Sequence, residues 1–215
     1  MLRDAFLETA HEARDLIASR DVQLRWHEPS ALREMSVGAL AGHLGRCAIG
    51  VEEYLDGEVP ANAPGLGGPL TADQYYTQGV ALTDDINDAL NTGVRQRGQE
   101  MAAEGQDALV GRVDGGLARL AARLTLEPST RTIVVFAGSV ITLDEYLVTR
   151  MLELAVHIDD LAVSVGRAPP DLPAATYMYA LGCMLQMARA RHGDLAVLRA
   201  MARRERDTVG ALRVF

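Results

Sequence analysis

Apolar residues recur at helical spacing along most of the chain, and each run ends near a glycine or a proline. Between Leu2 and about Leu24 the apolar side chains fall on one helical face, which predicts a first helix. Pro29 interrupts the pattern, because a proline disfavours the helical conformation in the residue before it. A second helix is predicted from about Ser36, a suitable N-cap, to about Asp56.

The stretch after the second helix is rich in glycine and proline. Gly57 to Leu70 contain seven such residues, which predicts a long loop. Thr71 then begins a helical stretch that extends to about residue 125. It is expected either as one helix or as two, with a break near Gly105 or Gly111.

The strongest strand signal lies in the second half of the chain. The β-branched runs Thr130–Phe136 and Ser139–Thr142 flank a glycine and predict a short β-hairpin. Thr142 and Glu145 then match a capping box, in which each side chain bonds to the backbone N–H of the other residue. They predict the start of a fourth main helix, which continues to Gly166.

Two further helices are predicted after this one. The first extends from about Pro173 to Arg191, and a short tail helix extends from about Asp194 to Arg206. The whole pattern predicts a mainly α fold, a four-helix up-and-down bundle with a short β-hairpin. We expect a single domain over residues 1–215, with the bundle core at about 2–191.

Composition supports a helical core and argues against a nucleic-acid partner. Hydrophobic residues make up 48% of the chain but aromatic residues only 5%, so the core rests on aliphatic side chains that suit packed helices. The net charge is −8. Nucleic acid is therefore not an expected partner, because binding to a phosphate backbone needs a basic surface.

Cysteine usage and hydropathy predict the compartment. Cys47 and Cys183 are far apart and form no CxxC pair, which is typical of a reducing environment. The N-terminal residues lack the apolar segment of a signal peptide, and no apolar stretch has the length needed to cross a bilayer. We therefore expect a cytoplasmic protein without a membrane partner.

A helix-spaced group of polar residues interrupts the apolar fourth helix. Glu153 and His157 are four residues apart, so their side chains share a face and can converge on one ion. Asp160 follows on that face and could orient the His157 imidazole, while Arg150 precedes Glu153 by three residues. The same spacing is common in Glu–His hydrogen bonds on solvated faces, and spacing alone favours that simpler interpretation.

His43 is the candidate for a third ligand. It lies in the segment AGHLGR, where small residues allow a neighbouring helix to approach and leave room for a site in the bundle. Two histidines and one glutamate form a known ligand set for catalytic zinc. A hydrogen-bonded core histidine is the alternative. Cys47 could be a further ligand or a reactive thiol, although a buried small apolar residue is the simpler interpretation.

Several of these segments together resemble a known family. Trp26 followed by Pro29-Ser30, the segment SVGALAGHLGR, the hairpin and the segment EYLVTRMLELAVHIDDLA are similar to the DinB-like superfamily. The resemblance is closest to the N-terminal metal-binding domain of mycothiol-dependent maleylpyruvate isomerases. It implies a four-helix bundle that binds one metal ion, Zn²⁺ or another divalent ion such as Ni²⁺, through His43, Glu153 and His157.

The resemblance also implies an activity. Such proteins use the metal beside a low-molecular-weight thiol such as mycothiol, which reacts with electrophilic substrates in isomerisation or thiol transfer. Arg46 and Arg150 would bind anionic groups of the thiol or the substrate, or else form ordinary ion pairs on helix surfaces. No catalytic residue is expected beyond the metal site.

Other expectations are less specific. The isomerases carry an additional C-terminal domain for which the chain up to Phe215 has no room, so we expect the metal and thiol chemistry rather than maleylpyruvate isomerisation itself. The alternative function is a non-catalytic metal-binding or ligand-sensing helical module. A homodimer is a further expectation, because dimers are common among bundles of this type.

Overall fold

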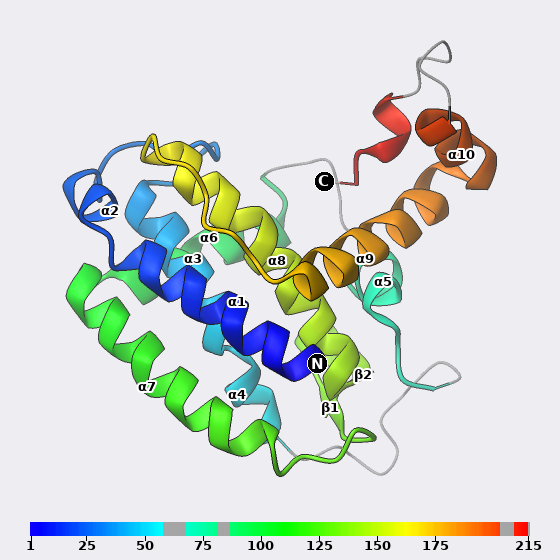
Figure 1. Cartoon of the computed structure of the whole chain (residues 1–215), viewed down its shortest axis with the longest axis horizontal. Helices are drawn as coiled ribbons and strands as arrows, with labels where there is room; N and C mark the ends of the chain where they lie inside the picture. Colours follow the sequence, from blue (N-terminus) through cyan, green and yellow to red (C-terminus); the bar gives the residue numbers. More distant parts are fainter. Residues whose placement is uncertain (58–67, 81–86, 203–208, 215) are drawn as a thin grey trace.

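The computed structural model describes residues 1–57, 68–80, 87–202 and 209–214, and shows a helical bundle with one small hairpin (Figure 1). This confirms the predicted mainly α fold. The elements are α1 (Leu2–Ile17), α2 (Arg20–Leu24), α3 (Val37–Ile49), α4 (Val51–Leu55), α5 (Ala72–Gln74), the π-helix η1 (Tyr75–Gly79), α6 (Ala89–Ala102), α7 (Gln106–Leu124), β1 (Thr132–Val134), the 3-10 helix η2 (Phe136–Gly138), β2 (Val140–Thr142), α8 (Leu143–Ser164), α9 (Ala174–His192), α10 (Asp194–Ala202) and the 3-10 helix η3 (Val209–Leu212). Within the described residues, no helix has the length and apolar character needed to cross a membrane.

Four helices form the centre of the bundle. Helices α1, α3, α7 and α8 pack against one another, and α6 packs along α3 while α9 packs against α8. Their shared core contains fully buried side chains such as Phe6, Leu44, Leu117 and Leu154. Burial of apolar surface stabilises the fold by about 25 cal/mol per Å², so these apolar contacts dominate its stability.

Three predicted helices are interrupted in the structure. The first ends at Ile17, and Ser19 begins the short α2 by accepting a backbone hydrogen bond as its N-cap. The second is divided at Gly50 into α3 and α4. In the described residues, the stretch that begins at Thr71 forms α5, η1, α6 and α7 instead of one or two helices, and its residues 81–86 lie outside the described part of the chain. The predicted break at Gly105 is confirmed, since its φ of 89° favours glycine.

The last helices agree with the prediction where the structure describes them. Helix α8 ends just before Gly166, which has a φ of 73°, and α9 begins directly after Pro173. Residues 203–206 of the predicted tail helix lie outside the described residues, as do residues 58–67 of the predicted loop.

The hairpin and a neighbouring segment anchor the start of α8. Strands β1 and β2 pair antiparallel, and Leu70 adds a parallel bridge to Ile141. The predicted capping box forms only in part. Thr142 accepts a hydrogen bond from the backbone of Glu145, but the Glu145 carboxylate accepts one from the backbone N–H of Ala72 at 2.8 Å. Glu145 thus ties the start of α5 to the start of α8 rather than closing its own helix end.

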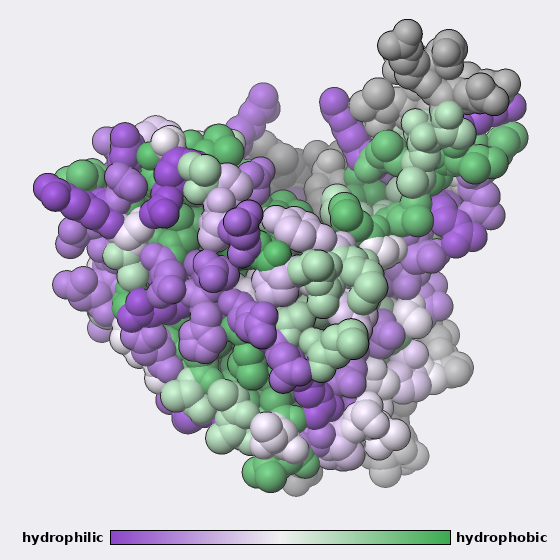
Figure 2. All heavy atoms as spheres, viewed as in Figure 1, coloured by the Kyte–Doolittle hydropathy of each residue, from purple (hydrophilic) through white to green (hydrophobic). Residues whose placement is uncertain are grey.

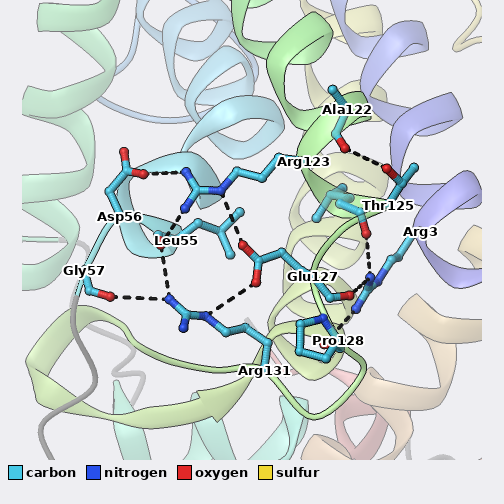
Figure 3. A network of polar contacts seen from close by, with 11 residues as sticks. Arg3, Leu55, Asp56, Gly57, Ala122, Arg123, Thr125, Glu127, Pro128 and Arg131 are labelled. Carbon is cyan, nitrogen blue, oxygen red and sulfur yellow. Dashed lines mark hydrogen bonds and ion pairs between the residues drawn. The ribbon is translucent and has the colours of Figure 1, made fainter.

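An arginine network joins three helices at one end of the bundle (Figure 3). Arg123 and Arg131 both donate to the carbonyl oxygen of Leu55, the last residue of α4, at 2.6 and 3.2 Å. Arg3 of α1 donates to the carbonyl oxygen of Leu124, the last residue of α7, at 2.6 Å. Carbonyl groups at helix C-terminal ends lack partners within their helix and carry partial negative charge. The guanidinium groups satisfy them and so connect α1, α4 and α7.

Exposed apolar side chains gather on α9 and α10 (Figure 2). On α10, Leu195, Leu198 and Met201 are each more than half exposed. Residues three apart lie on the same side of a helix. Helix α10 therefore has an apolar face that the other described residues leave uncovered.

The close packing of α6 on α3 depends on two glycines. A Cβ atom at Gly42 would overlap the carbonyl oxygen of Gly98, and a Cβ atom at Gly98 would lie 2.6 Å from the carbonyl oxygen of Ala39. The small residues around His43 predict such an approach, and the structure confirms it. The backbone of α6 consequently lies directly beside His43.

We expect Gly42→Ala to destabilise the protein by about 1–3 kcal/mol, because the added methyl group forces α3 and α6 apart. Gly111→Ala in α7 is the matched control, since no atom lies within 4 Å of the added Cβ. Helix propensity alone should then stabilise the protein by up to about 1 kcal/mol. Urea denaturation measures both changes, and the same effect from both variants would contradict the packing account.

Candidate metal centre

Helix α8 places Glu153 and His157 together, as their spacing predicts. His157 Nε2 lies 3.3 Å from Glu153 Oε2, and both side chains are 17% exposed. The intervening Leu154 is buried in the core, as is Ile158, so this part of α8 runs through the bundle. The pair is therefore largely buried, unlike an ordinary Glu–His hydrogen bond on a solvated face.

Helix α3 brings His43 to the same place. His43 Nε2 lies 3.8 Å from Glu153 Oε2, and the His43 and His157 rings meet edge to face with centroids 4.7 Å apart. One potential ligand atom from each of the three side chains lies within 4.8 Å of the other two. The structure thus brings together three residues whose proximity the sequence could not establish by spacing alone.

The distances from Glu153 to the two histidines suit a divalent metal ion. Two ligands at about 2.0–2.2 Å from one ion are up to about 4.4 Å apart, and the Glu153 distances of 3.3 and 3.8 Å fall within that limit. A buried carboxylate without compensation is costly, and a cation between these atoms would compensate it. Among the described residues, this is the one group of at least three His, Cys, Asp or Glu side chains that converges in this way.

Asp160 orients the His157 ring, as its place on the helix predicts. Its Oδ2 accepts a hydrogen bond from His157 Nδ1 at 2.9 Å. The other ring nitrogen, Nε2, is thereby left facing Glu153. Carboxylates that bind the second nitrogen of an imidazole in this way fix the tautomer and the orientation of metal ligands.

Tyr76 is a residue of the site that the sequence analysis missed. Its hydroxyl donates to Glu153 Oε1 at 2.8 Å, with the carbonyl oxygen of Thr149 as a second acceptor at 3.1 Å. Tyr76 belongs to the π-helix η1, a rare conformation that often occurs at functional sites. Apolar periodicity does not predict such a turn, and the one cue in the sequence is the adjacent pair Tyr75-Tyr76.

The carboxylate and one imidazole have pKa values that suit a cation site. Burial raises the pKa of Glu153, but the adjacent His157 and His43 side chains outweigh burial and hold the pKa well below its usual range. Burial is also the main cause that lowers the pKa of His43. Glu153 is therefore an anion at neutral pH, and His43 is a neutral imidazole that can donate its electron pair.

His157 differs from His43 because two carboxylates contact it. Burial lowers the pKa of His157, but its hydrogen bond with Asp160 and its contact with the Glu153 carboxylate outweigh burial and raise the pKa to about 9. In the chain without a metal, the His157 proton therefore supplies positive charge beside Glu153. A metal ion that binds there must displace this proton.

The three side chains open onto a cavity of about 870 Å³, a volume suited to a small molecule. Among the described residues, its acidic lining residues are Glu153 and Asp160, both in contact with His157. The arginines that line it are Arg33, Arg46, Arg95, Arg97 and Arg150. In a chain with a net charge of −8, the described lining of this cavity thus contains more arginines than acidic residues.

The two arginines singled out from the sequence both line this cavity, but their surroundings differ. Arg46 forms a bidentate ion pair with Glu53, with N···O distances of 3.1 and 3.2 Å. Arg150 lies over the Tyr146 ring at 4.8 Å and donates through Nε to Thr149 Oγ1. In the part of the chain that the structure describes, Arg150 pairs with no carboxylate. Its guanidinium is the better placed of the two for an anionic ligand.

Cys47 lies next to His43 but outside the converging group. Its Sγ is 3.7 Å from His43 Nε2, yet it does not belong to the set of atoms that lie within 4.8 Å of one another. Burial raises the pKa of Cys47 to about 12. The thiol therefore stays protonated at neutral pH, and its environment is that of a buried small apolar side chain.

Comparison with known proteins identifies the family. The family model described as the mycothiol maleylpyruvate isomerase N-terminal domain matches residues 6–162. The chain belongs to this family. The resemblance inferred from the sequence is thereby confirmed, whereas comparison with the curated proteins and with the solved structures returned no match.

The part that matches the mycothiol maleylpyruvate isomerase N-terminal domain contains the whole candidate centre. His43, Tyr76, Glu153, His157 and Asp160 all lie within it. Helices α9 and α10 follow the matched part. The candidate ligands thus belong to the family's own domain, while the exposed apolar face of α10 does not.

We expect the metal-free protein to lose stability as the pH rises through about 9. Because the folded-state pKa of His157 is raised above its ordinary value of 6.5, the contribution of its proton is fully present below pH 6.5 and is lost above about 9. Urea denaturation with a chelator, on the wild type and on His157→Gln, measures this contribution as the difference between the two proteins. A difference that is the same at pH 6.5 and above pH 9 would contradict the assigned pKa.

Proposed function

We propose that the chain binds one divalent metal ion through His43, Glu153 and His157. The observation that carries this proposal is the convergence of the three side chains from α3 and α8 on a largely buried point. Two imidazoles and one carboxylate form a ligand set of catalytic zinc sites, which keep a position open for substrate. Zn²⁺ is the proposed ion, and the same donor set also accepts ions such as Ni²⁺.

The cavity supports a thiol cofactor of the mycothiol type as the second component. Membership of the mycothiol maleylpyruvate isomerase N-terminal domain family supports such a thiol, and the cavity of about 870 Å³ beside the candidate ligands provides space for it. A bound divalent ion lowers the pKa of a coordinated thiol, so that a nucleophilic thiolate is present at neutral pH. The proposed activity is the isomerisation of an electrophilic substrate or transfer of the thiol to it, inside the cell.

Each residue of the candidate site has a defined part in this proposal. Glu153 and the two histidines hold the metal, and Asp160 keeps His157 Nε2 directed toward it. Arg150 binds an anionic group of the substrate or the thiol, because its guanidinium faces the cavity without a carboxylate partner among the described residues. Arg46, held by Glu53, contributes positive charge at a distance.

A non-catalytic metal-binding or ligand-sensing module is the second candidate. One observation favours it: Glu153 and Asp160, the described acidic residues along the cavity, both contact His157. The Cys47 thiol is protonated at neutral pH. Among the described residues of the cavity, no carboxylate or thiol is therefore free to act as a general acid or base.

Loss of either histidine should remove the metal. We expect His43→Ala and His157→Ala to retain no divalent ion after desalting, because two donors remain at a site that needs three. His27→Ala is the matched control, since His27 is exposed and should leave the metal content unchanged. Elemental analysis of the purified proteins measures the content. Full metal content in both ligand variants would overturn the proposed centre.

Arg150 should determine turnover of anionic substrates. With mycothiol and a panel of electrophiles, we expect Arg150→Gln to lower kcat/KM for carboxylate-bearing electrophiles by about ten-fold or more, the effect of losing a charged hydrogen bond. Arg46→Gln should have a smaller effect, because Glu53 already engages that guanidinium. A larger loss in Arg46→Gln would contradict this assignment. No consumption of thiol by the wild type would favour the non-catalytic module.

A further inference from the structure

The two oxygens of the Glu153 carboxylate have different partners. Oε2 faces both histidines, at 3.8 Å from His43 Nε2 and 3.3 Å from His157 Nε2. Oε1 instead accepts the hydrogen bond from the Tyr76 hydroxyl at 2.8 Å. One oxygen is thus directed toward the candidate metal position, and the other is held on the side of η1.

The position of Tyr76 is fixed by its own segment. The π-helix is closed by a hydrogen bond from Val80 N to the carbonyl oxygen of Tyr75 at 2.8 Å. The preceding α5 is tied to α8 through the backbone N–H of Ala72 and the Glu145 carboxylate. Tyr76 itself is only 2% exposed. The hydroxyl that bonds to Glu153 therefore belongs to a buried side chain on an anchored segment.

We propose that Tyr76 is a positioning residue of the metal centre, which holds Oε1 of Glu153 so that Oε2 stays directed at the histidines. The inference rests on the proposed metal-binding function. The Glu153 carboxylate can rotate about its Cγ–Cδ bond. The hydrogen bond from the Tyr76 hydroxyl to Oε1 opposes this rotation. Mutation of a residue that orients a metal ligand typically weakens metal binding by about 10–100-fold.

The test compares Tyr76→Phe with Tyr75→Phe. Both variants remove one hydroxyl from neighbouring residues of η1, and both keep the buried ring. The Tyr75 hydroxyl has no hydrogen-bond partner among the described residues, which makes Tyr75→Phe the matched control. The proteins are titrated with Co²⁺ alone against a competing chelator, and the visible absorption of the bound Co²⁺ is recorded.

We expect Tyr76→Phe to weaken Co²⁺ binding by about ten-fold or more and to change the visible spectrum of the bound ion. Tyr75→Phe should keep the affinity and the spectrum of the wild type. The spectrum separates positioning from general stability, because a merely less stable protein that still binds Co²⁺ would show the wild-type bands. Thermal denaturation without metal confirms that all three proteins are folded at the titration temperature.

Two results would overturn this inference, and they are distinguishable. Binding by Tyr76→Phe with the affinity and spectrum of the wild type would overturn the role of Tyr76 and leave the metal centre intact. Failure of the wild type itself to bind Co²⁺ would overturn the proposed centre, and the inference about Tyr76 with it.

Discussion

The buried carboxylate of Glu153 is the constraint on which the candidate site depends. A charge removed from water inside a helical bundle is unfavourable unless nearby groups compensate it. Here the compensation comes from His43, His157 and Tyr76, which contact the two carboxylate oxygens. These side chains belong to α3, α8 and η1, so the surroundings of one carboxylate depend on how three elements pack together.

Each of these elements is held in place by a different local feature. Gly42 allows α6 to pack directly against α3 beside His43, and the Glu145 carboxylate ties the segment before η1 to α8. At one end of the bundle, Arg3 and Arg123 bond to the carbonyl ends of α7 and α4 (Figure 3). The elements that carry the site are thus held by contacts with their neighbours, as is required when side chains must keep a fixed geometry for a ligand.

The parts of the structure that follow from local rules can be predicted from the sequence. The Glu153–His157 pair follows from helical spacing, and the helix break at Gly105 follows from the positive φ that glycine tolerates. His43 requires the family resemblance, because periodicity does not say which faces of separate helices meet. Tyr76 is not predictable in this way, since a π-helix changes which residues face inward and no local rule relates residues so far apart.

A crystal structure of the zinc-loaded protein, with diffraction measured on both sides of the zinc absorption edge, tests the central claim most directly. The account predicts one anomalous peak at about 2.0–2.2 Å from His43 Nε2, His157 Nε2 and Glu153 Oε2. A peak bound by other residues, or no peak among these three side chains, would contradict it.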